Sequence, residues 1–265
     1  WSSAVCSSDL LERIPRLSRA QSMDVRSAQA TIGGYRAVLV ATIQYQRFFP
    51  LMMTSAGSAK PARVVILGVG VAGLQAIATA RRLGAQVWAY DVRPETSEQV
   101  ESLGAKFIDL DLGEEGSGEG GYAKELSDEA KQKQQQLLSE ELQKADVLIS
   151  TAAIPCRPAP RLITEETVKG MREGSVIIDM AAATGGNCEL TEAGSVIVKH
   201  GVQIVGHTNY PAMVPADASS FFSRNLVNLM ELLVTREDEK LVRPDYMEDE
   251  VTEAALVVYQ GKVRF

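Results

Sequence analysis

The chain has 265 residues, of which 45% are apolar and 23% are charged, as in ordinary folded proteins and unlike disordered, collagen-like or coiled-coil chains. Its 34 acidic and 27 basic residues give a net charge of -7, so no overall positive field attracts nucleic acid or anionic lipid. The longest uncharged run, 64–80, contains three glycines and falls short of the roughly 20 apolar residues of a membrane span.

Cysteine and histidine do not occur in metal-binding or disulfide patterns. The three cysteines, Cys6, Cys156 and Cys188, include no CxxC pair, and the two histidines, His200 and His207, are seven positions apart. We therefore expect no disulfide framework and no metal site. We expect no basic partner that would lower the pKa of the loop cysteines Cys156 and Cys188, and therefore no reactive thiol, and we expect structural roles for the histidines.

Several elements can be predicted in chain order. Residues 16–46 are expected to form a long helix, interrupted or bent near Gly33 and Gly34. After a stretch of small residues, short β-branched runs alternate with helical patterns. The predicted strands are 63–67, 86–90, 106–110, 146–150, 175–179, 196–199 and 202–206, and the predicted helices are 94–103, 122–145, 165–171 and 216–235. This alternation predicts an α/β fold with a doubly wound parallel sheet.

The same patterns suggest a domain organisation. Residues 1–10 lack periodicity and an initiator Met, and we expect them to be a non-native start. We expect 11–60 to be the remnant of a first α/β subdomain with a connecting helix, and 61–211 to be the doubly wound domain. Residues 212–265 are then a return helix and a tail that packs on the first subdomain.

A glycine loop follows the first predicted strand of the sheet. Gly68, Gly70 and Gly73 have the GxGxxG spacing, and a predicted helix follows at once. In this context the first glycine permits a tight turn, the second lets a pyrophosphate approach the backbone, and the third lets the helix pack on the strand. The amides of the helix N-terminus then face the phosphates. The loop therefore predicts a Rossmann-type dinucleotide site.

An acidic residue occupies the position that contacts the ribose in such sites. Asp91 ends the next predicted strand, 23 residues after Gly68, where a carboxylate can accept both hydroxyls of the adenosine ribose. Arg93 could pair with a 2′-phosphate, but Asp91 would repel that group at close range. NAD(H) is thus preferred over NADP(H). The alternative is that the glycines only permit packing and Asp91 caps the 94–103 helix.

Beyond these motifs, residues 11–265 resemble the NAD(H)-binding component, domain I, of proton-translocating NAD(P) transhydrogenase. The resemblance rests on seven segments: RLSRAQSMD (16–24), GVGVAGLQAIATARRLGA (68–85), YDVRPE with EQVESLGAKF (90–107), GGYAKEL (120–126), IPCRPAPRLIT (154–164), GSVIIDMAAATGGNCE (174–189) and KHGVQIVGHTNYP (199–211). Members of this family carry roughly another hundred N-terminal residues.

The resemblance also implies roles for particular residues. Four residues match the loop that holds the nicotinamide for hydride transfer: Arg16, Gln21, Asp24 and Ser27. A loop that closes over the nucleotide would end near Gly121 and Tyr122, with Gln134 in reach, and Ala153 would make a backbone contact to the cofactor. Cofactor-binding positions are Gly68, Gly70, Val71, Gly73, Asp91, Val92, Arg93, Gly121, Tyr122, Gln134 and Ala153. No metal is implied.

Simpler interpretations exist for two of these groups. The residues Ser18 and Gln21 have the spacing of a capping box, and Asp24 suits a helix N-terminus. The spacing also fits the nicotinamide-side role, because Gln21, Asp24 and Ser27 are three apart and would share one face of a helix, while Arg16 could reach from the preceding loop. The stretch 113–121 has five glycines and no apolar residue, so it should be mobile, and Tyr122 could simply pack on the following helix.

By this resemblance the chain binds NADH and presents it for direct hydride transfer to NADP+. The NADP(H) is bound by a partner component, and a membrane component couples transfer to proton movement. The family also implies a homodimer at the cytoplasmic face of the inner membrane. No acid-base pair is visible, and hydride transfer between nicotinamides needs none. The alternatives are an alanine dehydrogenase-like oxidoreductase and a catalytically silent NAD-binding module.

Overall fold

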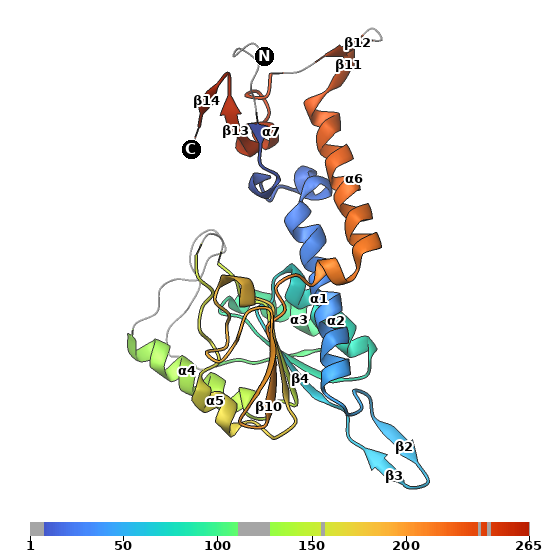
Figure 1. Ribbon diagram of the computed structural model, residues 1–265, viewed down its shortest axis with the longest axis vertical. Coiled ribbons are helices and arrows are strands. Elements are labelled where there is room, and N and C mark those ends of the chain that lie inside the picture. Colours follow the sequence, from blue (N-terminus) through green and yellow to red (C-terminus); the bar gives the residue numbers. More distant parts are fainter. Residues whose placement is uncertain (1–7, 111–127, 155–156, 238–239, 243–244, 265) are drawn as a thin grey trace. The chain divides into compact units, whose positions relative to one another are not determined.

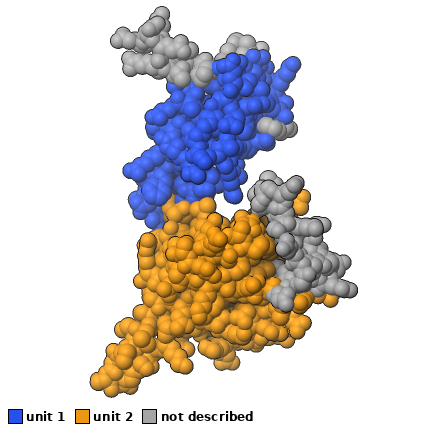
Figure 2. All heavy atoms as spheres, turned by 180° about the vertical axis from the view of Figure 1, so that it is seen from behind, with its two compact units in different colours: residues 1–30, 214–265 blue, residues 31–213 orange. Residues whose placement is uncertain are grey.

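The computed structural model describes residues 8–110, 128–154, 157–237, 240–242 and 245–264. The chain divides into two compact units, coloured separately in Figure 2. Unit 1 comprises 1–30 and 214–265, and unit 2 comprises 31–213. The boundary between them falls inside one helix, α1 (Val25–Gln44).

Unit 2 is built on a seven-stranded sheet with the order β6-β5-β4-β7-β8-β10-β9. Neighbouring strands are parallel except for β9, which is antiparallel to β10. The strands are β4 (Arg63–Leu67), β5 (Gln86–Tyr90), β6 (Lys106–Phe107), β7 (Val147–Ser150), β8 (Val176–Asp179), β9 (Val196–Lys199) and β10 (Val202–Val205). The predicted Rossmann-type α/β fold is confirmed, although β6 is shorter than the expected 106–110.

Helices cover both faces of this sheet (Figure 1). They are α2 (Val71–Arg82), α3 (Ser97–Ser102, after a 3-10 turn at Pro94–Thr96), α4 (Asp128–Leu142) and α5 (Glu165–Gly170). Alternate residues of each strand face opposite ways: in β4, Val64 and Ile66 pack with α1, α2 and α3, whereas Val65 and Leu67 pack with α4 and α5. Strands buried on both faces explain the continuous β-branched runs.

Helix α1 is continuous, so the predicted interruption at Gly33 and Gly34 is wrong. The glycines serve close packing instead. A Cβ atom at Gly34 would lie 2.1 Å from the carbonyl oxygen of Ala72, and one at Gly33 would lie 3.1 Å from the Cε of Met180. Helix α1 therefore approaches the first turn of α2 at a point where a side chain has no room.

The segment before α1 also differs from the prediction of one long helix. It contains the 3-10 turns Leu11–Arg13 and Ser18–Met23, and α1 begins only at Val25. A hairpin that the sequence did not predict, β2 (Met52–Thr54) and β3 (Gly57–Ala59), follows α1 and forms a separate two-stranded sheet.

Unit 1 combines helices with small antiparallel sheets. Helix α6 (Pro215–Leu233) matches the predicted 216–235, and it is followed by α7 (Glu250–Ala255). Strands β1 (Ser8–Asp9), β13 (Leu256–Tyr259) and β14 (Lys262–Val263) form one sheet, and β11 (Thr235–Glu237) pairs with β12 (Lys240–Val242). Its core consists of Ile14, Ala20, Met23, Leu229, Val251 and Ala255. Among the described helices of the chain, none is long and apolar enough to cross a bilayer.

Candidate functional site

The glycine loop connects the carboxyl end of β4 to the N-terminus of α2. Gly68 has a φ of +90°, and a Cβ atom at Gly73 would lie 1.9 Å from the carbonyl oxygen of Gly68. These two glycines are required by the turn and by the packing of helix on strand. A Cβ atom at Gly70, in contrast, would meet nothing within 4 Å. The middle glycine therefore leaves its backbone open to an approaching group.

The loop lies at the point where the strand order of the sheet reverses. From β4 the chain continues outward to β5 and β6, and β7 then returns to pair with the other edge of β4. Thr151, which follows β7, donates its hydroxyl to the carbonyl oxygen of Gly68 at 2.9 Å and so ties the loop to β7. Ligands of doubly wound sheets bind at this switch point.

The N-terminus of α2 completes this side of the site. Gly70 is the N-cap residue and no side chain caps the helix. The first helical residue, Val71, is 39% exposed. Uncapped amides and the helix dipole favour an anion here. The open backbone at Gly70 and this helix end fit the pyrophosphate of a dinucleotide.

Asp91 follows β5 and faces the same loop. Its side chain is only 7% exposed, and its Oδ2 accepts a hydrogen bond of 2.7 Å from the amide of Val69. Arg93 donates from its amide and from two guanidinium nitrogens at 2.9–3.0 Å. Burial opposes the charge of Asp91, but the hydrogen bonds from Arg93 and from the Val69 amide outweigh it, and the pKa of this carboxyl lies below its usual value.

Asp91 does not cap the helix that follows it, so the alternative role suggested by the sequence is wrong. The N-cap residue of the 3-10 turn Pro94–Thr96 is Arg93, without a side-chain cap, and α3 begins at Ser97 with Thr96 as its N-cap. Asp91 instead joins the glycine loop to the segment after β5. Val92, which lies between Asp91 and Arg93 in the sequence, is 39% exposed.

A buried amide supports the segment that contains Ala153. The Nδ2 of Asn187 donates to the carbonyl oxygens of Ala152 and Pro160, both at 2.8 Å, and its Oδ1 accepts from Ser150. Ala153 itself is exposed. The sequence does not point to Asn187, because the hydrogen-bond partners of a loop asparagine cannot be read from its position in the chain. It fixes the backbone beside the predicted cofactor contact.

Three predicted positions cannot be placed. Gly121 and Tyr122 lie outside the described residues, as does most of the predicted closing loop. Gln134 lies in α4, but its side chain is not described. Their roles stay predictions.

Unit 1 contains the four residues predicted to hold the nicotinamide. Arg16 and Gln21 are exposed, and their side chains make no hydrogen bond or ion pair with a described residue. Asp24 is buried; its carboxylate accepts from the amide of Ser27 at 3.1 Å and from the Ser27 hydroxyl at 2.6 Å. The cap interpretation of Asp24 thus describes its geometry. The capping box of Ser18 and Gln21 is absent, because Leu17 is the N-cap of that turn.

The predicted common face of Gln21, Asp24 and Ser27 is wrong, because these residues belong to different elements. Gln21 lies in the turn Ser18–Met23, Asp24 follows it, and Ser27 lies in α1. Two asparagines of α6 hold this turn: Asn225 and Asn228 donate to the carbonyl oxygen of Ser22 at 2.7 and 2.9 Å. The sequence offered no signal for them, since an asparagine on an amphipathic helix is usually solvated.

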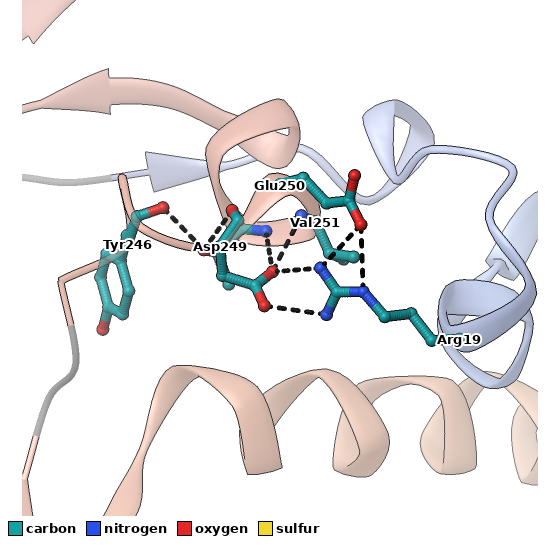
Figure 3. Close-up of polar contacts among 6 residues, drawn as sticks. Arg19, Tyr246, Asp249, Glu250 and Val251 are labelled. Atoms are coloured by element: carbon teal, nitrogen blue, oxygen red, sulfur yellow. Dashed lines mark hydrogen bonds and ion pairs between the residues drawn. The ribbon is translucent and has the colours of Figure 1, made fainter.

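Within the same turn, Arg19 is an anchor. Figure 3 shows its guanidinium against Asp249 and Glu250 at the start of α7. Asp249 also caps α7, because it accepts from the amides of Val251 and Thr252. Arg19 therefore attaches the RLSRAQSMD segment to the start of α7.

Both histidines contact neighbouring side chains, and the described cysteine is buried. His200 pairs with the exposed Glu165 at 2.9 Å, and the His207 ring packs edge-on against Tyr210. Burial raises the pKa of the Cys188 thiol to about 11, so it is un-ionised at neutral pH. Among the described residues there is no cluster of three metal-ligating side chains.

Residues 37–265 match the family model described as "Alanine dehydrogenase/PNT, C-terminal domain". The chain belongs to this family. It is 53% identical over 255 residues to a Rhodospirillum rubrum protein that is named as the first portion of the NAD(P) transhydrogenase alpha subunit, and the alignment covers 96% of this chain and 66% of that protein. The chain thus spans just under two thirds of that relative. The resemblance found in the sequence motifs is confirmed.

Transhydrogenases and alanine dehydrogenases, the two kinds of protein in this family's description, differ in their similarity to this chain. The crystal structure of transhydrogenase from Sinorhizobium meliloti superposes with a TM-score of 0.84 at 46% identity, over 97% of this chain and 68% of that one. "Alanine dehydrogenase 1" from Staphylococcus aureus is 32% identical over 130 residues, covering 48% of this chain and 34% of its own length. Sequence similarity to the transhydrogenases thus extends across both units.

Proposed function

We propose that this chain is the NAD(H)-binding component of a proton-translocating NAD(P) transhydrogenase. The observation that carries the proposal is the site at the sheet reversal, where Gly70 leaves the backbone open, α2 is uncapped and Asp91 faces the loop. Asp91 would accept the ribose hydroxyls of the adenosine and disfavour a 2′-phosphate. The extent of the similarity to transhydrogenases supports the assignment.

The protein's own role in this reaction is binding and orientation. Bound NADH supplies the hydride. Gly68, Gly70, Val71 and Gly73 would hold the pyrophosphate, while Asp91, Val92, Arg93 and Ala153 would contact the nucleoside. By family resemblance, Arg16, Gln21, Asp24 and Ser27 would orient the nicotinamide, and Gly121, Tyr122 and Gln134 would cover the cofactor. Orientation and exclusion of water suffice for transfer between two nicotinamides.

The proposal includes partners. Only the GxGxxG loop at Gly68 directly follows a predicted strand, so we infer that a second dinucleotide is held elsewhere. NADP(H) would be bound by a separate component, and a membrane component would couple transfer to proton movement. The relative from Rhodospirillum rubrum is named as one portion of an alpha subunit, which supports the existence of further components. A homodimer at the cytoplasmic face of the inner membrane completes the proposal.

Reconstitution tests the assignment. The purified chain should bind NADH, should give no transfer to an NADP+ analogue alone, and should support transfer once the soluble NADP(H)-binding component is added. Arg16→Ala or Gln21→Ala should reduce that transfer with folding retained. Transfer by the chain alone would contradict the proposal. Reduction of pyruvate with ammonia would favour an alanine dehydrogenase, and binding without transfer in the full mixture would favour a silent module.

A second measurement tests the cofactor preference. Asp91→Asn should weaken NADH binding by about 1–3 kcal/mol, because a buried acceptor is replaced by a poorer one. NADPH should gain relative to NADH. Equal affinities of the unmodified chain for the two dinucleotides would contradict the role of Asp91.

A further inference from the structure

The carboxylate of Asp91 has no acceptor position left for a ligand. Its Oδ1 accepts from the amide and the Nε of Arg93, at 3.0 and 2.9 Å. Its Oδ2 accepts from the amide of Val69 and from a terminal guanidinium nitrogen of Arg93, at 2.7 and 3.0 Å. An ionised carboxylate accepts about four hydrogen bonds. The two ribose hydroxyls that Asp91 is proposed to bind would therefore have to replace donors that are already there.

Only two of these four donors can be given up. The amide of Val69 belongs to the glycine loop, and the amide of Arg93 is held in place because the Arg93 carbonyl accepts from the amide and the hydroxyl of Thr96. The guanidinium, in contrast, ends a side chain that is 32% exposed. Rotation of this side chain would release one position on each carboxylate oxygen and leave the backbone unchanged.

We propose that Arg93 is a specificity-determining residue that competes with the adenosine ribose for the carboxylate of Asp91, so that cofactor binding exchanges a guanidinium for two ribose hydroxyls. The inference rests on the proposed function and deepens it. In the paired state the charges of Asp91 and Arg93 cancel, and the pair offers little repulsion to a 2′-phosphate. Arg93 thus lowers the affinity for NADH and also weakens the rejection of NADPH.

The electrostatics of the pair agree with this exchange. The positive charge of Arg93 lowers the pKa of Asp91, and the negative charge of Glu95 raises the pKa of Arg93. Burial disfavours ionisation of Asp91, while the hydrogen bonds of Arg93 favour it and keep the pKa of the carboxyl low. If the guanidinium is removed, burial is less fully compensated and the pKa of Asp91 rises.

The variant Arg93→Met tests the competition, because methionine retains a flexible aliphatic stem but has no donor. Binding of NADH and of NADPH is titrated separately at pH 7 by nicotinamide fluorescence. We expect the ratio of the NADPH to the NADH dissociation constant to rise about ten-fold, as for loss of one charge-assisted hydrogen bond. Arg93→Lys, which retains the charge without the fork, should move the ratio in the same direction by less.

A matched control and a pH series separate this role from a structural one. Arg82→Met removes the same charge from an exposed position in the last turn of α2, at the far end of the helix from the glycine loop, and should leave the ratio unchanged. As the pH is lowered, NADH affinity should begin to fall at a higher pH in Arg93→Met than in the unmodified chain, because the guanidinium no longer favours the ionised form of Asp91. Loss of folding alone would not shift a pH profile in this way.

The outcomes distinguish the inference from the proposed function. Failure of the unmodified chain to bind NADH would overturn both. Binding of NADH with an unchanged ratio in Arg93→Met, or in Arg93→Lys if the methionine variant does not fold, would overturn the inference and leave the proposed function standing. A crystal structure of the unmodified chain with NADH needs no variant: the guanidinium should have left Asp91, and a retained bidentate pair would refute the exchange.

Discussion

Arg19 and Asp249 form two hydrogen bonds, of 2.8 and 3.1 Å, although 230 positions separate them in the sequence. The same carboxylate caps α7 through the amides of Val251 and Thr252 (Figure 3). One side chain thus fastens the turn Ser18–Met23 to the C-terminal segment of unit 1. The turn carries Gln21, which is proposed to face the nicotinamide, so the ion pair fixes the backbone on which that residue depends.

The two roles of Asp249 can be separated by substitution. Asp249→Ala removes both the cap and the ion pair, and loss of an N-cap costs about 1 kcal/mol of stability. Asp249→Asn retains a capping oxygen and removes the charge, so it should cost less, because an exposed ion pair contributes little. Thermal unfolding of both variants measures the difference. Equal destabilisation by the two substitutions would indicate that the charge matters more than the cap.

Acid should weaken this attachment. The hydrogen bonds from Arg19 lower the pKa of the Asp249 carboxyl in the folded protein. A carboxyl with a depressed folded pKa contributes stability that is present above its unfolded pKa, about 3.9, and is lost as the pH falls through the folded value. The unmodified chain should therefore lose more stability between pH 5 and pH 3 than Asp249→Asn does. Parallel pH profiles for the two proteins would contradict this linkage.

Elements that depend on local pattern could be predicted from the sequence. Runs such as RVVIL and QVWAY form β4 and β5 because a strand buried on both faces needs consecutive apolar residues along most of its length. The glycine loop was found because its three glycines follow a strand at fixed spacing. Pairings between distant segments could not be found in this way: β1 joins β13, and nothing near residue 8 indicates a partner near residue 258.

A sequence pattern is ambiguous where one residue type serves two purposes. Gly33 and Gly34 suggested a break in the helix, but the space they leave accommodates the Ala72 carbonyl and the Met180 side chain. For Asp91 and Arg93, the sequence assigns the ribose to Asp91 and opposes a 2′-phosphate at Arg93, but it does not show that the two side chains are paired. Spacing alone does not indicate that two side chains two positions apart turn toward each other, and their bidentate contact became visible only in the structure.

Asn225 and Asn228 should matter for transfer more than for cofactor affinity. Both donate to the Ser22 carbonyl next to Gln21, so the double variant Asn225→Ala with Asn228→Ala frees that turn. In the reconstituted mixture we expect kcat to fall roughly ten-fold with a smaller change in KM, because orientation is lost before binding. Ser223→Ala, at an exposed position of the same helix, serves as the control. An unchanged kcat in the double variant would exclude the positioning role.

The glycines provide the sharpest separation of folding from binding. Gly34→Ala places a methyl group 2.1 Å from the Ala72 carbonyl oxygen, and Gly73→Ala places one 1.9 Å from that of Gly68. Both variants must shift the backbone, and overpacking of this kind costs about 1–3 kcal/mol.

Gly70 has a φ of -85°, which alanine adopts without strain, and open space beyond its Cβ position. Gly70→Ala should therefore fold normally and yet bind NADH at least about ten-fold more weakly, because the added methyl group occupies the path of the pyrophosphate. Circular dichroism and NADH titration of the three variants measure the two effects, and normal NADH binding by folded Gly70→Ala would place the pyrophosphate elsewhere.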